Sequence, residues 1–149
     1  MLRAGALLAV GGAAVPLTGC DLFDGDEPAP PPDPLEPLAG ESGELAARHR
    51  AAVAADPGLA DRLTPIADAH AAHADELRRL IGRPAPSGSA APGPSTTAAD
   101  RDTLLADLRA AEQRGRDNAV RACATAPGER AALLGSIAAA RATHLEALK

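Results

Sequence analysis

The sequence predicts an all-α fold, a bundle of four helices. The chain is rich in Ala, Leu, Arg and Asp and poor in β-branched residues, and this composition favours helix over sheet. From Leu38 onward the apolar residues recur at helical spacing. Stretches rich in Pro and Gly, at 56–58, 83–97 and 126–128, divide this pattern into four segments.

Each segment carries its own start or stop signals. We expect helices over 37–54, 57–82, 98–124 and 128–148. Asp56 can cap the second helix with Pro57 as its first residue, and Thr97 with Asp100 resembles a capping box before the third. Pro65, inside the second segment, should kink that helix or mark a restart.

The second and fourth segments share one apolar pattern. In each segment, the residues of this pattern are spaced alternately three and four positions apart. That is the spacing of the buried seam of a bundle helix. A shift of 71 residues superposes Leu63 on Leu134, Ile66 on Ile137, His70 on Arg141, His73 on His144 and Leu77 on Leu148. The same shift places Glu41 on Glu112. We interpret the chain as two related helical hairpins packed face to face.

A Pro/Gly/Ser-rich linker, residues 83–97, joins the two hairpins. Fifteen extended residues reach about 50 Å, whereas a helix of about 25 residues is about 38 Å long. The linker can therefore cross the full height of the bundle. It can equally form an insertion at one end, and the sequence does not separate these alternatives.

The first nineteen residues predict a secretory signal peptide. Arg3 is followed by an uncharged, largely apolar run over 4–17, which is too short to span a membrane. The run ends in Leu17-Thr18-Gly19-Cys20, which resembles the bacterial lipobox. The resemblance implies lipid transfer to the Cys20 thiol and cleavage before it. We therefore expect a protein anchored to the outer face of the cell membrane.

The residues after Cys20 predict a spacer. Residues 21–36 hold six acidic residues, no basic residue and a Pro-rich centre, so they should stay extended and solvated. We expect a lipidated tether over 20–36 and a helical domain over 37–149. That domain has fourteen basic and fourteen acidic residues, and Phe23 is the chain's one aromatic residue. The sequence therefore predicts no nucleic-acid partner.

The candidate site is a set of polar residues on the predicted seams. Their distances from the two hairpin turns place them near mid-bundle, and the set consists of Glu41, His70, His73, Glu112, Arg141 and His144. This pattern resembles the ferritin-like carboxylate proteins, in which two helices give a lone Glu and two give Glu-x-x-His. Glu41 and Glu112 match the lone carboxylates, and His73 and His144 match the histidines. His70 and Arg141 stand where that family has carboxylates, so the bridging ligands of a paired iron site are missing.

The ferritin-like resemblance covers residues 37–149, and a narrower one combines three features of the chain. The lipobox, the acidic Pro-rich tether and the His-x-x-His of DAHAAHADEL are similar to the actinobacterial ferritin-like domain of unknown function. The resemblance implies a ferritin-like four-helix bundle in a cell-envelope lipoprotein. It implies no defined activity.

Two interpretations of the polar residues remain open. Glu41, His70, His73, Glu112 and His144 offer donors for one zinc or iron ion. Alternatively, the same residues form a closed polar layer in which Arg141 pairs with Glu112 or Glu41.

Two other functions are alternatives: a di-metal oxidase or iron-binding protein, and a helical module that binds an envelope partner or apolar ligand. The module would show an exposed apolar patch. No Ser-His-Asp set, Walker loop or dinucleotide fingerprint occurs in the sequence, which favours a protein that is not an enzyme.

Three further residues have simple structural interpretations. His49, between Arg48 and Arg50, is expected to be a half-exposed helix residue. Cys123, in a run of alanines, is expected to be a small core residue. Gly115 is expected to allow close approach of two helices.

Overall fold

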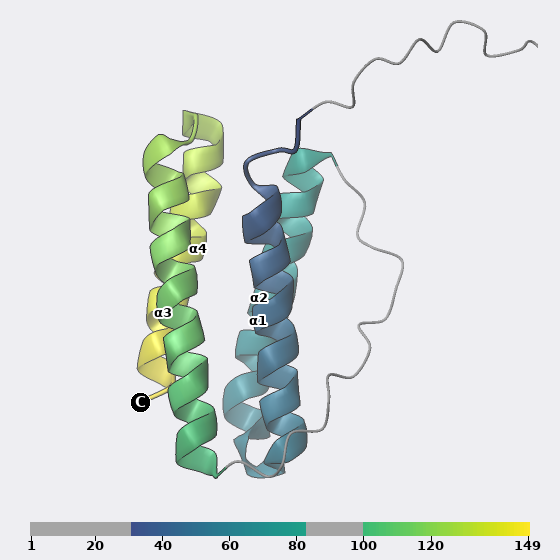
Figure 1. Ribbon diagram of the computed structural model, residues 1–149, viewed down its shortest axis with the longest axis vertical. Coiled ribbons are helices and arrows are strands. Elements are labelled where there is room, and N and C mark those ends of the chain that lie inside the picture. The colour runs from purple at the N-terminus through teal and green to yellow at the C-terminus, as the bar shows by residue number, and fades with distance from the viewer. Residues whose placement is uncertain (1–30, 83–99) are drawn as a thin grey trace, which may run out of the picture. The chain divides into compact units, whose positions relative to one another are not determined.

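The computed structural model describes residues 31–82 and 100–149, which form four α-helices and one short 3-10 helix (Figure 1). The elements are α1 (Glu36–Ala55), η1 (Pro57–Leu59), α2 (Ala60–Ile81), α3 (Arg101–Thr125) and α4 (Gly128–Ala147). These two stretches contain no strand, so the predicted all-α bundle of four helices is confirmed. The signal peptide, Cys20, most of the tether and the linker over 83–97 lie outside the described residues.

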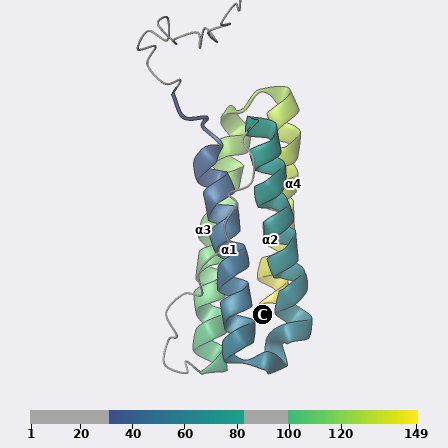
Figure 2. The same cartoon turned by 90° about the vertical axis from the view of Figure 1, so that its right-hand side faces the viewer.

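The helices form two antiparallel hairpins, α1 with α2 and α3 with α4 (Figures 1 and 2). At the start of α3, Arg101 Nε lies 2.7 Å from a carboxylate oxygen of Asp56, in the turn that ends α1. Arg130, near the start of α4, lies 2.9 Å from Asp33, which precedes α1. The chain therefore enters α3 at the end of the bundle opposite to the end where α2 stops. As a result α2 and α3 run parallel, while α1 packs antiparallel to α3 and α2 antiparallel to α4.

The helix starts follow local hydrogen-bonding chemistry. The Asp56 carboxylate accepts a 2.9 Å hydrogen bond from the Gly58 N–H, as predicted for the cap of the second helix. Asp100 caps α3, because its carboxylate accepts a 2.8 Å hydrogen bond from the Thr103 N–H. Thr97, the cap expected from the sequence, lies outside the described residues. The predicted restart at Pro65 is wrong, since α2 continues through it and the irregular turn comes earlier, at η1.

The helical unit begins slightly before the predicted boundary at residue 37. Leu35 is buried in the core, and the Asp33 carboxylate accepts two hydrogen bonds from the Arg130 guanidinium. This contact with Arg130 holds the pKa of Asp33 below its usual range. The last residues assigned to the tether therefore belong to the packed unit.

The core consists of two apolar clusters separated along the bundle by polar residues. One cluster includes Leu38, Leu77, Ala119, Leu134 and Ile137. The other includes Leu59, Leu63, Leu105, Leu108 and Leu148. On every helix, the polar residues described below lie between the residues that belong to one apolar cluster and the residues that belong to the other. The apolar side chains thus exclude water from a polar layer at mid-bundle.

Gly115 lies where two helices and a long side chain meet. A Cβ atom at this position would lie 2.7 Å from Arg141 Nη1 and 3.1 Å from Leu45 Cδ1, which is closer than such atoms normally approach. The prediction of close approach at Gly115 is confirmed. Within the described stretches, no helix combines the length and the hydropathy needed to cross a membrane.

Candidate functional site

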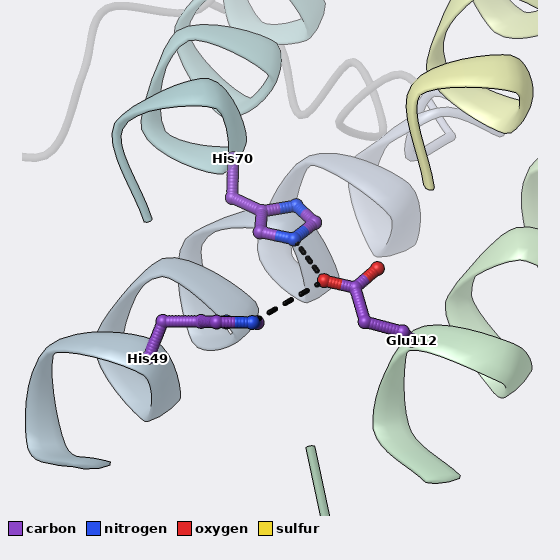
Figure 3. A group of neighbouring side chains, drawn as sticks. All are labelled: His49, His70 and Glu112. Carbon is purple, nitrogen blue, oxygen red and sulfur yellow. Dashed lines mark hydrogen bonds and ion pairs between the residues drawn. The ribbon is translucent and has the colours of Figure 1, made fainter. Parts of the chain in front are cut away.

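Each of the four helices places one side chain at a common point inside the bundle. These residues are His49 on α1, His70 on α2, Glu112 on α3 and His144 on α4, which we call the histidine cluster. His49, His70 and Glu112 are completely buried, and His144 is 9% exposed. Figure 3 shows the rings of His49 and His70 turned toward the Glu112 carboxylate.

Glu112 Oε1 is the centre of the histidine cluster. It forms a hydrogen bond with His70 Nε2 and lies 3.6 Å from His49 Nε2 and 3.6 Å from His144 Nδ1. One donor atom from each of His49, His70 and Glu112 lies within 4.8 Å of the other two. Imidazole nitrogens and a carboxylate oxygen at this spacing could hold a metal ion.

The protonation of His49 is set by its own helix. Its Nδ1 lies 2.9 Å from the carbonyl oxygen of Leu45, and because a carbonyl only accepts, Nδ1 must carry the proton. In the neutral ring, Nε2 then has a free lone pair. That lone pair lies near the Glu112 carboxylate, so two acceptors approach each other with no proton between them.

Several buried polar atoms of the cluster have no hydrogen-bond partner within residues 31–82 and 100–149. They include His49 Nε2, His70 Nδ1 and Glu112 Oε2. The His144 Nδ1 contact, at 3.6 Å, is also too long for a hydrogen bond. Buried polar groups in native proteins are almost always satisfied. A closed, fully hydrogen-bonded polar layer therefore does not describe this cluster.

The electrostatics of the cluster favour an ionised Glu112 beside a neutral His49. Burial raises the pKa of Glu112, but the neighbouring imidazoles of His144 and His70 outweigh this effect and lower the pKa to about 2. Burial lowers the pKa of His49, with His70 and His144 adding to the effect. The cluster thus presents an ionised carboxylate and a neutral His49 at neutral pH, the states that metal binding requires.

A second set of polar side chains surrounds Arg141, one turn of α4 before His144. The Arg141 guanidinium donates to Glu41 Oε2 at 3.1 Å, to the Gly115 carbonyl at 2.6 Å and to Ser42 Oγ at 2.8 Å. Asn118 Nδ2 donates to the other Glu41 oxygen at 2.8 Å. We call these five residues the arginine cluster. Arg141 is fully buried and pairs with Glu41, so its charge is balanced without Glu112.

The six predicted site residues do not form one site in the structure: they lie in the histidine cluster, in the arginine cluster and at the edge of the first. His70, Glu112 and His144 come together, and Glu41 pairs with Arg141. His73 lies at the edge of the histidine cluster, half-buried, with its ring centroid 6.1 Å from that of His70. The pairing of Arg141 with Glu41 is one of the two pairings considered from the sequence.

One expectation about a single residue needs correction. His49 was expected to be half-exposed, but it is completely buried and belongs to the histidine cluster. The signal that could have found it is the seam of buried residues on α1, with steps of four and three through Leu38, Ser42, Leu45, His49 and Ala52. Cys123 is half-buried, and its thiol donates to the Ala131 carbonyl at 3.3 Å.

The shift between the two hairpins explains the place of Glu41. Under a shift of 71 residues, buried Leu63, Ile66, His70 and Leu77 of α2 fall on buried residues of α4. The turns are related by a shift of 70, which places Pro57 on Pro127. The buried positions of α1 and α3 follow the turns, so Leu38 matches Leu108 and Ser42 matches Glu112. Glu41 is therefore one residue off the seam and remains partly exposed.

We found no match to this chain among protein-family models, curated proteins or solved structures.

Proposed function

We propose that this bundle binds one divalent metal ion through His49 Nε2, His70 Nε2 and Glu112, with His144 Nδ1 as the fourth ligand. The observation that carries the proposal is the free lone pair of His49 Nε2, buried 3.6 Å from an ionised carboxylate oxygen. A cation between these two acceptors would turn a repulsive contact into two favourable ones.

The spacing of the donors suits a tetrahedral ion. Metal–donor distances of about 2.0–2.1 Å in a tetrahedral zinc site place the donors about 3.3–3.4 Å apart. The contacts of Glu112 Oε1 with His49 and His144 are each 3.6 Å, close to this spacing. His70 Nε2 is hydrogen-bonded to the same oxygen, so it has to move away from Glu112 for an ion to enter. The Nδ1–H of His49 bound to a backbone carbonyl is the usual outer contact of a metal-bound histidine.

The donor set favours zinc over other ions, with ferrous iron as the nearest competitor. Three imidazole nitrogens and one carboxylate are a normal set for zinc, and two histidines with one carboxylate also bind ferrous iron. Four protein ligands would fill a tetrahedral site and leave no position for a substrate. We therefore propose a structural ion that ties the four helices together, in a protein without catalytic activity.

The two alternative functions receive less support. A di-metal oxidase needs bridging carboxylates, yet Glu112 is the one carboxylate in the histidine cluster and Glu41 is held by Arg141. We therefore derive no step through a paired iron site. A module that binds apolar partners needs an exposed apolar patch, and within the described part of the chain Val120 is the one large apolar side chain that is exposed.

We propose that the bundle is ferritin-like and is held at the outer face of the cell membrane by lipidated Cys20. Two antiparallel hairpins whose connection joins opposite ends of the bundle support the first proposal, and the lipobox-like sequence over 17–20 supports the second. In the native host, Cys20→Ser should leave the protein without acyl chains and uncleaved before residue 20. Intact-mass measurement that still detects acyl chains on the variant would contradict the anchor.

Metal analysis of the full chain, purified without chelator, tests the metal site. We expect close to one zinc or iron ion per chain, and its loss in His49→Ala. Arg48→Ala is the matched control, because this exposed neighbour on α1 lies outside the histidine cluster and should leave the metal content unchanged. A wild-type chain that stays metal-free when offered both ions, or an ion retained by His49→Ala, would overturn the proposal.

A further inference from the structure

The helices around the histidine cluster are least closely packed between α2 and α4. Among neighbouring helix pairs in the described part of the chain, α2 and α4 contact each other least. Of the cluster residues, His49, His70 and Glu112 have no exposed surface, and His144 on α4 retains a little. The seam between α2 and α4 is therefore the side on which we look for the entrance to the cluster.

His73 lies on that seam. Arg62, near the start of α2, donates a hydrogen bond to the carbonyl oxygen of Ala147 on α4, which shows that this side of α2 faces α4. His73 follows Arg62 by about three helical turns, so it lies on the same side of α2. Arg141 and His144, both on α4, interact electrostatically with its ring.

The His73 ring spans the boundary between solvent and the cluster. The residue is half-buried, yet its Nδ1 is completely buried and has no hydrogen-bond partner in the described stretches. The ring meets that of His70 edge-on, with the centroids 6.1 Å apart. One nitrogen of the His73 ring therefore lies inside the bundle beside His70 with no partner in the described residues.

We propose that His73 is the entry residue for the metal ion, a transient ligand that receives a hydrated divalent cation at the seam and passes it to His70 and Glu112. This inference rests on the proposed metal site. A divalent cation loses its bound water reluctantly, and a dry interior offers it no substitute until it reaches its ligands. An imidazole at the entrance replaces one water before the others are lost, which lowers the barrier to loading without adding a ligand to the final site.

The test compares loading rates with equilibrium binding in the metal-free full chain. Rapid mixing with Co²⁺ gives the loading rate from the visible absorption of the bound ion, and competition with a chelator gives the affinity. We expect His73→Ala to slow loading about tenfold or more, while one ion per chain still binds with nearly the wild-type affinity. His73→Asp, which restores a ligand at the entrance, should recover most of the rate.

Asp75→Ala is the matched control, because it removes an exposed charge two residues away on the same helix. It should leave the loading rate unchanged unless general attraction of cations sets that rate. Circular dichroism confirms that each variant keeps its helices.

Three outcomes separate this inference from the metal site itself. If the wild-type chain binds no ion, the proposed function fails. If it binds one ion and His73→Ala loads at the wild-type rate, the entry role fails and the metal site stands. If His73→Ala loses the ion at equilibrium, His73 is a resident ligand and the entry role is again wrong.

Discussion

The histidine cluster and the arginine cluster share the middle of one bundle, but they differ in how far their polar groups are satisfied. In the arginine cluster, a positive guanidinium donates three hydrogen bonds of 3.1 Å or less, to a carboxylate, a carbonyl and a hydroxyl, and its Nε is left without a partner in the described residues. In the histidine cluster, a carboxylate meets three imidazoles but forms one hydrogen bond. The comparison shows that a buried charge does not by itself mark a binding site. Unsatisfied donors and acceptors around it do.

The largest effect on stability should come from Arg141→Ala. This variant removes the fully buried guanidinium and opens a cavity. It leaves the Gly115 carbonyl without its donor and the Glu41 carboxylate with Asn118 but no positive partner. We expect a loss of about 3–5 kcal/mol in the free energy of unfolding, measured with urea. Breaking the more exposed ion pair with Arg130→Ala should cost much less. Equal costs for the two variants would show that the arginine cluster does not stabilise the fold.

Gly115→Ala should produce the next largest effect, because the added methyl group would overlap Arg141 Nη1 and press on Leu45. We expect a loss of about 1–3 kcal/mol in the free energy of unfolding. Gly40→Ala is the matched control, since nothing lies within 4 Å of a Cβ at that position. It should stabilise α1 by about 0.5–1 kcal/mol. If both variants were stabilising, the close packing around Gly115 would be refuted.

Acid should destabilise the metal-free chain through two groups whose pKa values are strongly shifted, Glu112 in the histidine cluster and His73 at its edge. The pKa of His73 is about 4 in the folded chain and 6.5 for an unperturbed histidine, so the unfolded chain binds more protons and stability is lost as pH falls from 6.5 to 4. The pKa of Glu112 falls from 4.5 to about 2, so its contribution is present above pH 4.5 and is lost as pH falls toward 2.

Urea unfolding at a series of pH values checks both groups. For half-exposed His73 we expect a loss on the order of 1 kcal/mol after allowance for solvent screening. His73→Gln should flatten the upper part of the pH profile and Glu112→Gln the lower part. A profile without slope between pH 6.5 and 4 would contradict the assignment for His73.

Much of the fold follows from the sequence because helical signals are local. The Pro and Gly positions separate the helices, and the capping role of Asp56 needs only the residues that follow it. The buried seams of α2 and α4 are equally readable, since Leu63, Leu77, Leu134 and Leu148 keep bundle spacing. These features depend on steric and hydrogen-bonding preferences within a few residues.

The site was only partly predictable from the sequence. Whether a side chain belongs to a cluster depends on which way it faces on its helix, and a shift of one residue changes that direction. Glu41 and Ser42 are neighbours, yet Ser42 lies on the seam and Glu41 at its edge. Alanines and glycines on α1 make its apolar stripe weak, so the charged neighbours of His49 suggested an exposed face. The partner of Arg141 likewise depends on the packing of α1 against α3 and α4, which no local pattern encodes.

The contrast between the two clusters is tested most directly by zinc titration calorimetry of three full-length chains: the wild type, His70→Ala and Glu41→Gln. We predict one tightly bound ion per chain for the wild type and for Glu41→Gln, which alters only the arginine cluster, and no tight binding for His70→Ala. Tight binding retained by His70→Ala, or lost in a folded Glu41→Gln, would contradict the claim that the histidine cluster holds the metal.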